Sequence, residues 1–323
     1  MAMTTAAAAA AATTTLEDLP ADVLACALRR LDGRSLAAAS CATAGLRALA
    51  ADPDTWRALC LARWSSLLQL QARLGLLLDS QRLFADAFPF PSLLADNLAG
   101  AEAPGDALQR RLPAELVSAV DVYHRGAALL SRAVETPASS SWFLSSPFRV
   151  DAVECGRSPA APAGGARGVP PAELELSWVV VDPRAGRAVN VSSRRPVAVD
   201  RHWYTGEALV RYAVVLGGCK LEATVTCAED AGSIREISLA AEDADGAALS
   251  GEGALRLLAA AMAGPRKGGE DQEEAAKRGY EEFVRSKRGR KESKARKEVL
   301  VDLCCSAVSA VAVLSFIAAV VLR

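Results

Sequence analysis

The chain has 323 residues, of which 51% are apolar, 23% charged and 5% aromatic. Its 37 basic and 38 acidic residues nearly cancel, which argues against a dedicated nucleic-acid-binding protein, because such proteins carry a basic surplus. The eight cysteines include no C-x-x-C pair, so a zinc ribbon or thioredoxin-type site has no support, and a reduced, intracellular setting is expected.

The N-terminal part divides into an Ala/Thr tract and a compact helical unit. Residues 1–15 lack charge and large apolar side chains, so we expect a disordered lead-in. Residues 16–64 predict three short helices, because apolar side chains recur at helical spacing with breaks at residues 32–33 and 52–53. A core this small needs a partner or an adjoining domain.

This unit resembles the F-box, the adaptor-binding module of SCF ubiquitin ligases. The likeness rests on Leu19-Pro20, the apolar stripe that follows, and Trp56 after the second break; the family's usual Trp-Arg pair is Leu46-Arg47 here. It implies docking on a Skp-type adaptor and, through that adaptor, recruitment of a cullin scaffold. The residues it assigns to adaptor contact are Leu19, Pro20, Val23, Leu24, Leu28, Leu31, Leu36 and Trp56. The alternative is an ordinary three-helix subdomain whose stripe is internal core.

The middle of the chain changes from helical to strand periodicity. Residues 65–115 predict a helical extension and a linker, and residues 116–263 predict seven or eight short strands with turns between them. A Pro/Gly/Ala-rich loop is expected at 158–171, an extended piece at 141–153 and a closing helix at 251–262. The predicted fold class is therefore α+β, with a central antiparallel sandwich-like domain.

Several blocks of this β-rich region are similar to those of a plant F-box family. They are SAVDVYHRG, SSWFLSSPFRVD, SSRRPVAVDRHW and VRYAVVL. Members of this family carry one F-box before a β-rich domain, so the likeness implies the same arrangement here. It names no substrate.

Arginines beside aromatic residues suggest a recognition surface in the β-rich domain, because they offer bidentate contacts and cation–π stacking. The candidate target-binding residues are Trp142, Arg149, Trp178, Arg194, Arg195, His202 and Trp203. In the alternative interpretation the tryptophans fill the core, while the arginines pair with Asp200 and Glu207.

The sequence contains no recognisable catalytic site. His124 and His202 are its two histidines, and neither lies in a nucleophile-elbow or thiol-protease context. Glycine-rich phosphate loops are also missing from the sequence. We therefore predict a protein that is not an enzyme, with no metal and no cofactor.

The C-terminal part predicts a charged stalk at 264–298 and a transmembrane tail anchor at 299–322. Residues 303–322 form a run of 20 uncharged residues, which spans about 30 Å as a helix, the thickness of a bilayer core. Eight basic residues between 285 and 297 precede this run and place the N-terminal part in the cytosol. We expect lipid contact in an intracellular membrane, foremost the endoplasmic reticulum. The alternative is a packed helix with a nuclear signal, in a soluble protein of the nucleus or cytoplasm.

Together these features predict the substrate-recognition subunit of an SCF-type E3 ubiquitin ligase. Its partners would be the adaptor, the cullin scaffold and a protein target whose identity the sequence leaves open, with no nucleic acid. Two alternatives stay open: a membrane-tethered binding module without a ligase role, and a soluble nuclear F-box protein.

Overall fold

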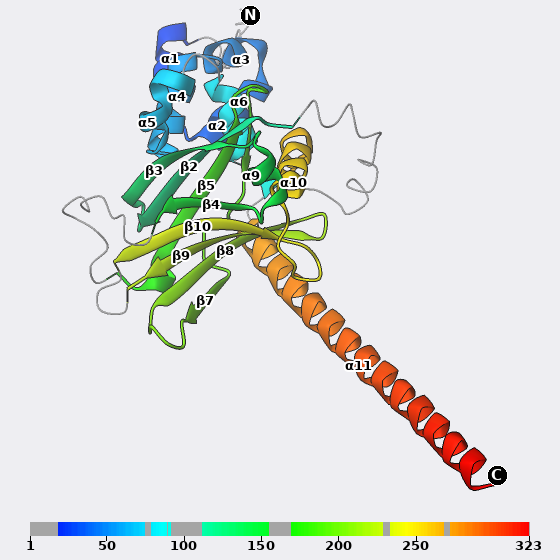
Figure 1. The fold of residues 1–323 in the computed structure, drawn as a ribbon. Coiled ribbons are helices and arrows are strands. Elements are labelled where there is room, and N and C mark those ends of the chain that lie inside the picture. The colour runs from blue at the N-terminus through cyan, green and yellow to red at the C-terminus, as the bar shows by residue number, and fades with distance from the viewer. Residues whose placement is uncertain are drawn as a thin grey trace, which may run out of the picture.

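The computed structural model describes residues 19–74, 79–88, 90–91, 112–154, 169–228, 233–267 and 272–322. The predicted Ala/Thr tract, most of the linker before residue 112 and most of the 158–171 loop lie outside these ranges. Figure 1 shows short helices at one end, two sheets in the middle and one long helix that projects away from both.

The N-terminal unit contains four helices rather than the predicted three. They are α1 (Ala21–Leu28), α2 (Gly33–Ala42), α3 (Ala44–Ala50) and α4 (Pro53–Arg63). The expected second helix is divided at Thr43, whose backbone is extended with φ −143° and ψ 162°. The Thr43 hydroxyl accepts a hydrogen bond from the Leu46 N–H at 3.2 Å, so this residue ends one helix and caps the next.

Two further helices join this unit to the sheets. They are α5 (Leu67–Leu74) and α6 (Ser80–Ala87), and α6 packs against α4 and against strand β6 (Arg187–Asn190). The Phe84 ring lies 5.5 Å from that of Trp56 and 5.7 Å from that of Trp64 between ring centroids. This aromatic cluster continues directly into apolar side chains of β2 (Glu115–His124) and β5 (Leu174–Asp182).

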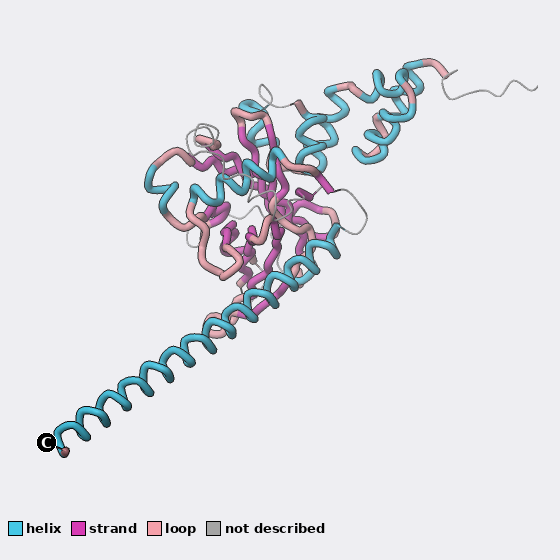
Figure 2. The backbone as a smooth tube through the Cα atoms, turned by 90° about the vertical axis from the view of Figure 1, so that its right-hand side faces the viewer, coloured by secondary structure: helices cyan, strands magenta, loops and turns pink. Residues whose placement is uncertain are grey.

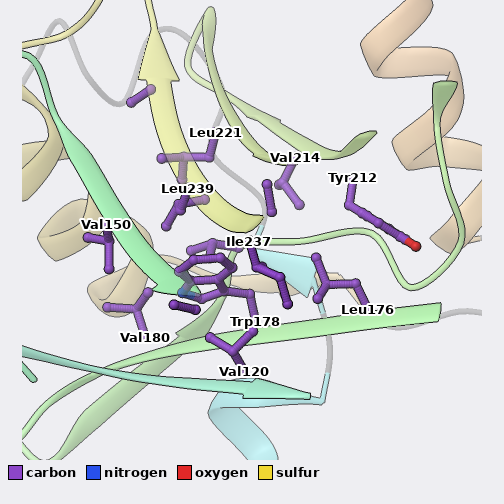
Figure 3. Packing of buried hydrophobic residues seen from close by; sticks show 14 of the residues in the cluster. Val120, Val150, Leu176, Trp178, Val180, Tyr212, Val214, Leu221, Ile237 and Leu239 are labelled. Carbon is purple, nitrogen blue, oxygen red and sulfur yellow. The ribbon is translucent and has the colours of Figure 1, made fainter. Parts of the chain in front are cut away.

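Two antiparallel sheets form the central domain and confirm the predicted mixture of helices and antiparallel strands. One has the order β3-β2-β5-β6, and the other has the order β4-β10-β9-β8-β7. The strands not yet given are β3 (Ala127–Pro137), β4 (Arg149–Val153), β7 (Ala198–Arg201), β8 (Ala208–Leu216), β9 (Cys219–Cys227) and β10 (Ile234–Glu242). Apolar side chains of both sheets share one core, in which Trp178 lies between Val120 and Ile237 (Figure 3).

Some elements differ from the prediction. The expected extended piece at 141–153 begins as a helix, α9 (Ser141–Ser145), because the Ser140 hydroxyl accepts a hydrogen bond from the Phe143 N–H at 3.1 Å and starts a turn. Strand β7 and the small sheet of β1 (Phe90–Pro91) and β11 (Arg266–Lys267) were not expected. A short 3₁₀ turn, η2 (Pro171–Glu173), precedes β5.

Two helices follow the sheets. Helix α10 (Gly251–Ala263) matches the closing helix of the prediction, and Gly251 lies so close to α9 that an added Cβ would be 2.1 Å from the Phe143 carbonyl oxygen. Helix α11 (Gln272–Val321) joins the predicted stalk and the predicted span in one uninterrupted helix of 50 residues, about 75 Å long. Figure 2 shows its second half far from the sheets.

Candidate adaptor- and target-binding surfaces

The start of α1 presents an apolar surface to solvent. Leu19 is 41% exposed and Val23 is 50% exposed, and Pro20 between them is also exposed. Cys26 and Ala27 are exposed too, three and four residues after Val23, so they continue the same helix face. The prediction did not include these two small residues, although their helical spacing from Val23 could have found them.

The other predicted adaptor-contact residues lie inside the helical unit. Leu24 and Leu28 are buried on the opposite face of α1, and Leu31 is half-buried against the same core. Leu36 has no exposed surface, and Trp56 is buried with its indole N–H donating to the Ala50 carbonyl oxygen at 2.7 Å. Leu36 and Trp56 are thus covered by the chain itself, and their contact with an adaptor stays a prediction.

A small hollow lies on the other side of α1 from Val23. It has a volume of about 210 Å³ and lies among α1, α2, α3 and α4. Its lining residues are Ala25, Leu28, Arg29, Leu36, Ala48, Leu49, Asp52 and Thr55. Since an apolar side chain of a partner would fit such a space, the hollow is a candidate contact point besides the exposed end of α1.

Buried hydrogen bonds connect the helical unit to the β2–β5 side of the sandwich. The Trp64 indole N–H donates to the Ser177 hydroxyl at 2.9 Å. The Asp121 carboxylate accepts the Ser66 N–H at 2.8 Å and the Ser66 hydroxyl at 2.6 Å. These bonds join residues far apart in the sequence, so the helices and the sheet are held in one relative orientation.

The seven predicted target-binding residues do not form one groove. Trp142, 77% exposed, lies on α9 beside β4, while Trp203, 90% exposed, follows β7. These strands are the two opposite edges of the five-stranded sheet, four strand spacings or about 19 Å apart. Trp178 is fully buried between the sheets, where it packs in the core, and target contact by it stays a prediction.

The predicted arginines make contacts within the chain. Arg149 pairs with Asp151 at 2.8 Å and with Glu236. The other two, Arg194 and Arg195, lie in the loop beside the start of α11. The Arg194 guanidinium pairs with Glu175 at 2.6 Å, and the Glu273 carboxylate of α11 accepts the backbone N–H groups of both loop arginines at 3.0–3.1 Å. Arg149 and Arg194 therefore stabilise the fold, although with different acids from the two that the sequence suggested.

His202 and Trp203 remain together on the hairpin between β7 and β8. The Thr205 N–H donates to His202 Nδ1 at 3.2 Å, and the His202 N–H donates to the Glu207 carbonyl oxygen at 2.8 Å. These bonds fix a turn from which Trp203 and its neighbour Tyr204 extend into solvent. The hairpin is thus a part of the predicted target surface that stays available for contact.

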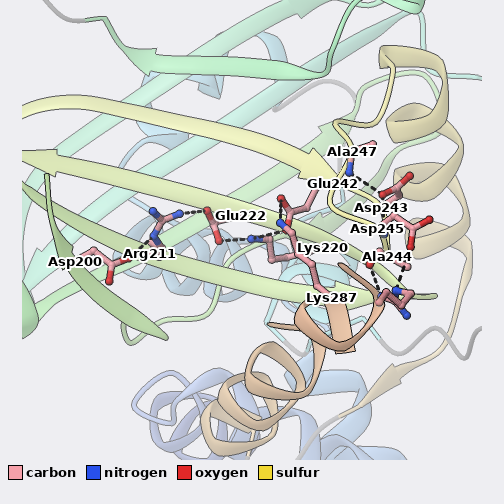
Figure 4. A network of polar contacts seen from close by, with 11 residues as sticks. Asp200, Arg211, Lys220, Glu222, Glu242, Asp243, Ala244, Asp245, Ala247 and Lys287 are labelled. Atoms are coloured by element: carbon pink, nitrogen blue, oxygen red, sulfur yellow. Dashed lines mark hydrogen bonds and ion pairs between the residues drawn. The ribbon is translucent and has the colours of Figure 1, made fainter. Parts of the chain in front are cut away.

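The first half of α11 packs across the outer face of the five-stranded sheet. Phe283 is buried there, and Lys287 pairs with Glu242 at 2.9 Å. Glu242 also pairs with Lys220 at 3.0 Å, and Lys220 in turn pairs with Glu222 at 2.6 Å (Figure 4). This series of ion pairs holds the first half of α11 against the five-stranded sheet, and beyond it the helix projects away.

The second half of α11 is apolar and uncovered. It meets the length and composition of a membrane-crossing helix, and its most apolar window is exposed along its whole length. A core helix of a soluble protein would be buried. This helix is therefore a candidate span.

The described residues contain no cluster of three or more His, Cys, Asp or Glu side chains suited to holding a metal ion. Burial raises the pKa of the Cys60 thiol to about 12 and that of Cys227 to about 11, so neither forms a thiolate at neutral pH. These two cysteines are therefore packing residues.

Comparison with known proteins identifies the family. Three proteins of Arabidopsis thaliana match nearly the whole chain, the first named "Probable F-box protein" and the other two "F-box protein". The first is 36% identical over 283 residues, covering 85% of this chain and 84% of its own length. The others are 35% and 32% identical and cover 84% and 86% of this chain, and 80% and 88% of their own. This chain belongs to the plant F-box protein family.

No protein-family model and no solved structure matches this F-box family member. About 85% of the chain is covered, which is more than the helical unit or the sandwich contains alone, so the likeness reaches into both. The F-box family assignment therefore applies to the whole two-part arrangement, which agrees with the resemblance seen in the sequence.

Proposed function

We propose that this chain is the substrate-recognition subunit of an SCF-type E3 ubiquitin ligase, tethered to an intracellular membrane. The likeness to F-box proteins over about 85% of the chain carries the proposal. The exposed apolar end of α1 supports it, because this surface offers a Skp-type adaptor an unoccupied docking site. The cullin scaffold would join through the adaptor.

Adaptor binding would bury the exposed parts of Leu19, Pro20 and Val23. Roughly half of each of the Leu19 and Val23 side chains is still open to water, so burying the remainder contributes about 1 kcal/mol per residue. The hollow beside α1 would receive an apolar side chain of the adaptor. Cys26 and Ala27 would lie at the same contact, where small side chains permit a close approach.

The protein would act by holding its target near a charged ubiquitin-conjugating enzyme, without chemistry of its own. Proximity raises the effective concentration of the reacting groups and so the rate of transfer. The buried bonds of Trp64 and Ser66 to the sandwich support this role, because they keep the adaptor-binding end and the target-binding domain in a fixed relation.

The apolar half of α11 supports a membrane tether. Its 20 uncharged residues match a bilayer core in length, and the preceding basic residues favour a cytosolic position for the rest of the chain. Such a tether would restrict the targets to proteins near one membrane, for which we propose the endoplasmic reticulum.

A pull-down with the purified Skp-type adaptor and the full chain in mild detergent tests the ligase role. The variant Leu19→Ala/Val23→Ala should bind about tenfold more weakly or worse, because it removes two exposed contacts without disturbing the core. Leu68→Ala is the matched control, since Leu68 is 57% exposed on α5 and should leave binding unchanged. Failure of the folded wild-type chain to bind the adaptor would favour the membrane-tethered binding module without a ligase role.

Alkaline carbonate extraction of membranes tests the tether separately. The full chain should stay in the membrane pellet, and a chain ending at residue 298 should be released. Extraction of the full chain into the soluble fraction, with nuclear enrichment, would instead favour the soluble nuclear F-box protein.

A further inference from the structure

Strand β7 is an edge strand whose outer side has no backbone partner among the described residues. It pairs with β8 alone, from Ala198 opposite Arg211 to Arg201 opposite Ala208. The His202 N–H donates to the Glu207 carbonyl oxygen, and hydrogen-bonded pairs alternate along an antiparallel ladder. The backbone N–H and C=O groups of Val199 and Arg201 therefore point away from β8, toward solvent.

Contacts within the chain occupy part of each of the other sheet edges. The Gln69 side-chain amide makes two hydrogen bonds to the backbone of β3, at 2.9 and 3.0 Å. At β6, Asp86 accepts the Ala188 N–H at 3.2 Å, and Arg266 donates to the Ala188 carbonyl oxygen at 2.9 Å. Three of the five residues of β4 are buried. Unpaired edges attract further strands, and for β7 no such contact is found on its outer side among the described residues, so β7 is an edge that another chain can extend (Figure 1).

Two aromatic side chains at the end of β7 are exposed to solvent. Trp203 is 90% exposed and Tyr204 is 79% exposed, with ring centroids 5.6 Å apart. Their turn is fixed by His202 and by the Thr205 hydroxyl, which donates to Glu207 at 2.9 Å. Large aromatic residues in a pre-ordered turn bind partners at little entropic cost and commonly dominate an interface.

The side chains of β7 specify the chemistry of the partner. Asp200 faces the outer side of the sheet, where it pairs with Arg211 at 2.8 Å. Val199, 45% exposed, and Arg201, exposed and without an ion pair among the described residues, lie two positions apart on the other face. A strand added to β7 would place one of its side chains opposite Val199 and another opposite Arg201. An apolar residue suits Val199, and a carboxylate suits Arg201.

We propose that β7 and the Trp203–Tyr204 hairpin bind an extended segment of a partner protein, which adds to the sheet as a further strand. The segment carries an apolar and an acidic residue two positions apart, and an additional apolar group that contacts the aromatic pair. The inference rests on the proposed function only in naming this partner as the ubiquitination target.

Selection from a yeast-displayed library of random twelve-residue peptides, with the full chain in detergent as bait, tests the proposal. Enriched peptides should share the apolar–x–acidic pattern and lack proline within it. Trp203→Ala and Arg201→Glu should each weaken binding about tenfold or more, since each removes a central contact. Trp142→Ala is the matched control, an exposed tryptophan at the opposite edge of the same sheet, and should not change binding.

Backbone N-methylation of one enriched peptide separates strand addition from contact with the aromatic pair alone. Two versions of the peptide are compared, one methylated at its odd positions and one at its even positions. One version should lose binding and the other should keep it, because only alternate N–H groups of an added strand face β7. Equal loss of binding by both methylated peptides would overturn the proposal. So would peptides that bind the Trp203→Ala variant as well as the wild type, or a selection that enriches no peptide. Adaptor binding by the same samples, measured in parallel, reports independently on the ligase role.

Discussion

Asp121 is the buried carboxylate at the joint between the helical unit and the sandwich, and Asp121→Ala tests whether this joint contributes to stability. None of the residue is exposed, and it accepts hydrogen bonds from both the backbone N–H and the hydroxyl of Ser66. The substitution leaves these two donors buried without their acceptor. A buried polar group left without a partner destabilises the fold by more than the net free energy that its hydrogen bond contributed.

The expected loss of stability follows from those two bonds. A hydrogen bond to a charged acceptor contributes about 1.5–3 kcal/mol, so the pair contributes at most about 6 kcal/mol. Burial raises the pKa of Asp121, which means that the ionised carboxylate is itself penalised in the folded state. The net cost of Asp121→Ala should therefore be about 2–4 kcal/mol, a fall in Tm of roughly 5–15 °C for a domain of this size.

Urea unfolding followed by tryptophan fluorescence measures this cost, because Trp64 lies at the same joint. Asp200→Ala is the control: Asp200 pairs with Arg211 but its side chain is 55% exposed, so its removal should cost less than about 1 kcal/mol. A double-mutant cycle of Asp121→Ala with Ser66→Ala should give a coupling energy of about 1 kcal/mol or more. A loss below about 0.5 kcal/mol for Asp121→Ala would refute the reasoning.

Three further predictions concern pH, packing and the tether. The pKa of Asp121 is raised above its ordinary 3.8 by burial, so the part of the stability that is linked to its protonation is fully present below that pH and is lost as the pH rises. Urea titrations should show wild type losing stability relative to Asp121→Asn as the pH is raised from 3.8. Leu36→Ala should destabilise the chain by about 2–5 kcal/mol in the same assay, because Leu36 is fully covered, while Leu68→Ala should cost less than about 0.5 kcal/mol. Leu314→Arg, near the middle of the apolar run, should release the chain from membranes in carbonate extraction, since a central arginine costs about 2.5–3.5 kcal/mol to insert; retention in the pellet would contradict the span.

Periodicity in the sequence located most of the regular elements. Strands β5, β8 and β9 lie in the region 116–263 for which the sequence predicted short strands, because their side chains alternate or form short apolar runs between turns. Helix α10 was predicted within one residue at its C-terminal end for the same reason. The elements that the sequence missed are short. Strand β7 has four residues, three of them exposed, and so carries no apolar pattern.

The sequence analysis also missed two helix starts that depend on capping side chains. The extended reading of 141–153 overlooked a helix of five residues, which depends on the Ser140 cap and on close packing of Gly251 against Phe143. The division of one expected helix at Thr43 has a similar origin, since threonine is tolerated in a helix and also caps one. In both cases the sequence allows two conformations, and contacts with the rest of the chain select one.

The sequence by itself determined the family and the order of helical unit, antiparallel strands and apolar helix. It could not decide which tryptophans are buried: Trp178 in β5 is covered by the second sheet, whereas Trp203 after β7 is exposed. It could not pair charges, since Arg194 pairs with Glu175 from a neighbouring strand and Arg149 with Glu236 from another. Side-chain exposure and ion pairing depend on neighbours that are distant in the chain, and tertiary structure alone brings those neighbours together.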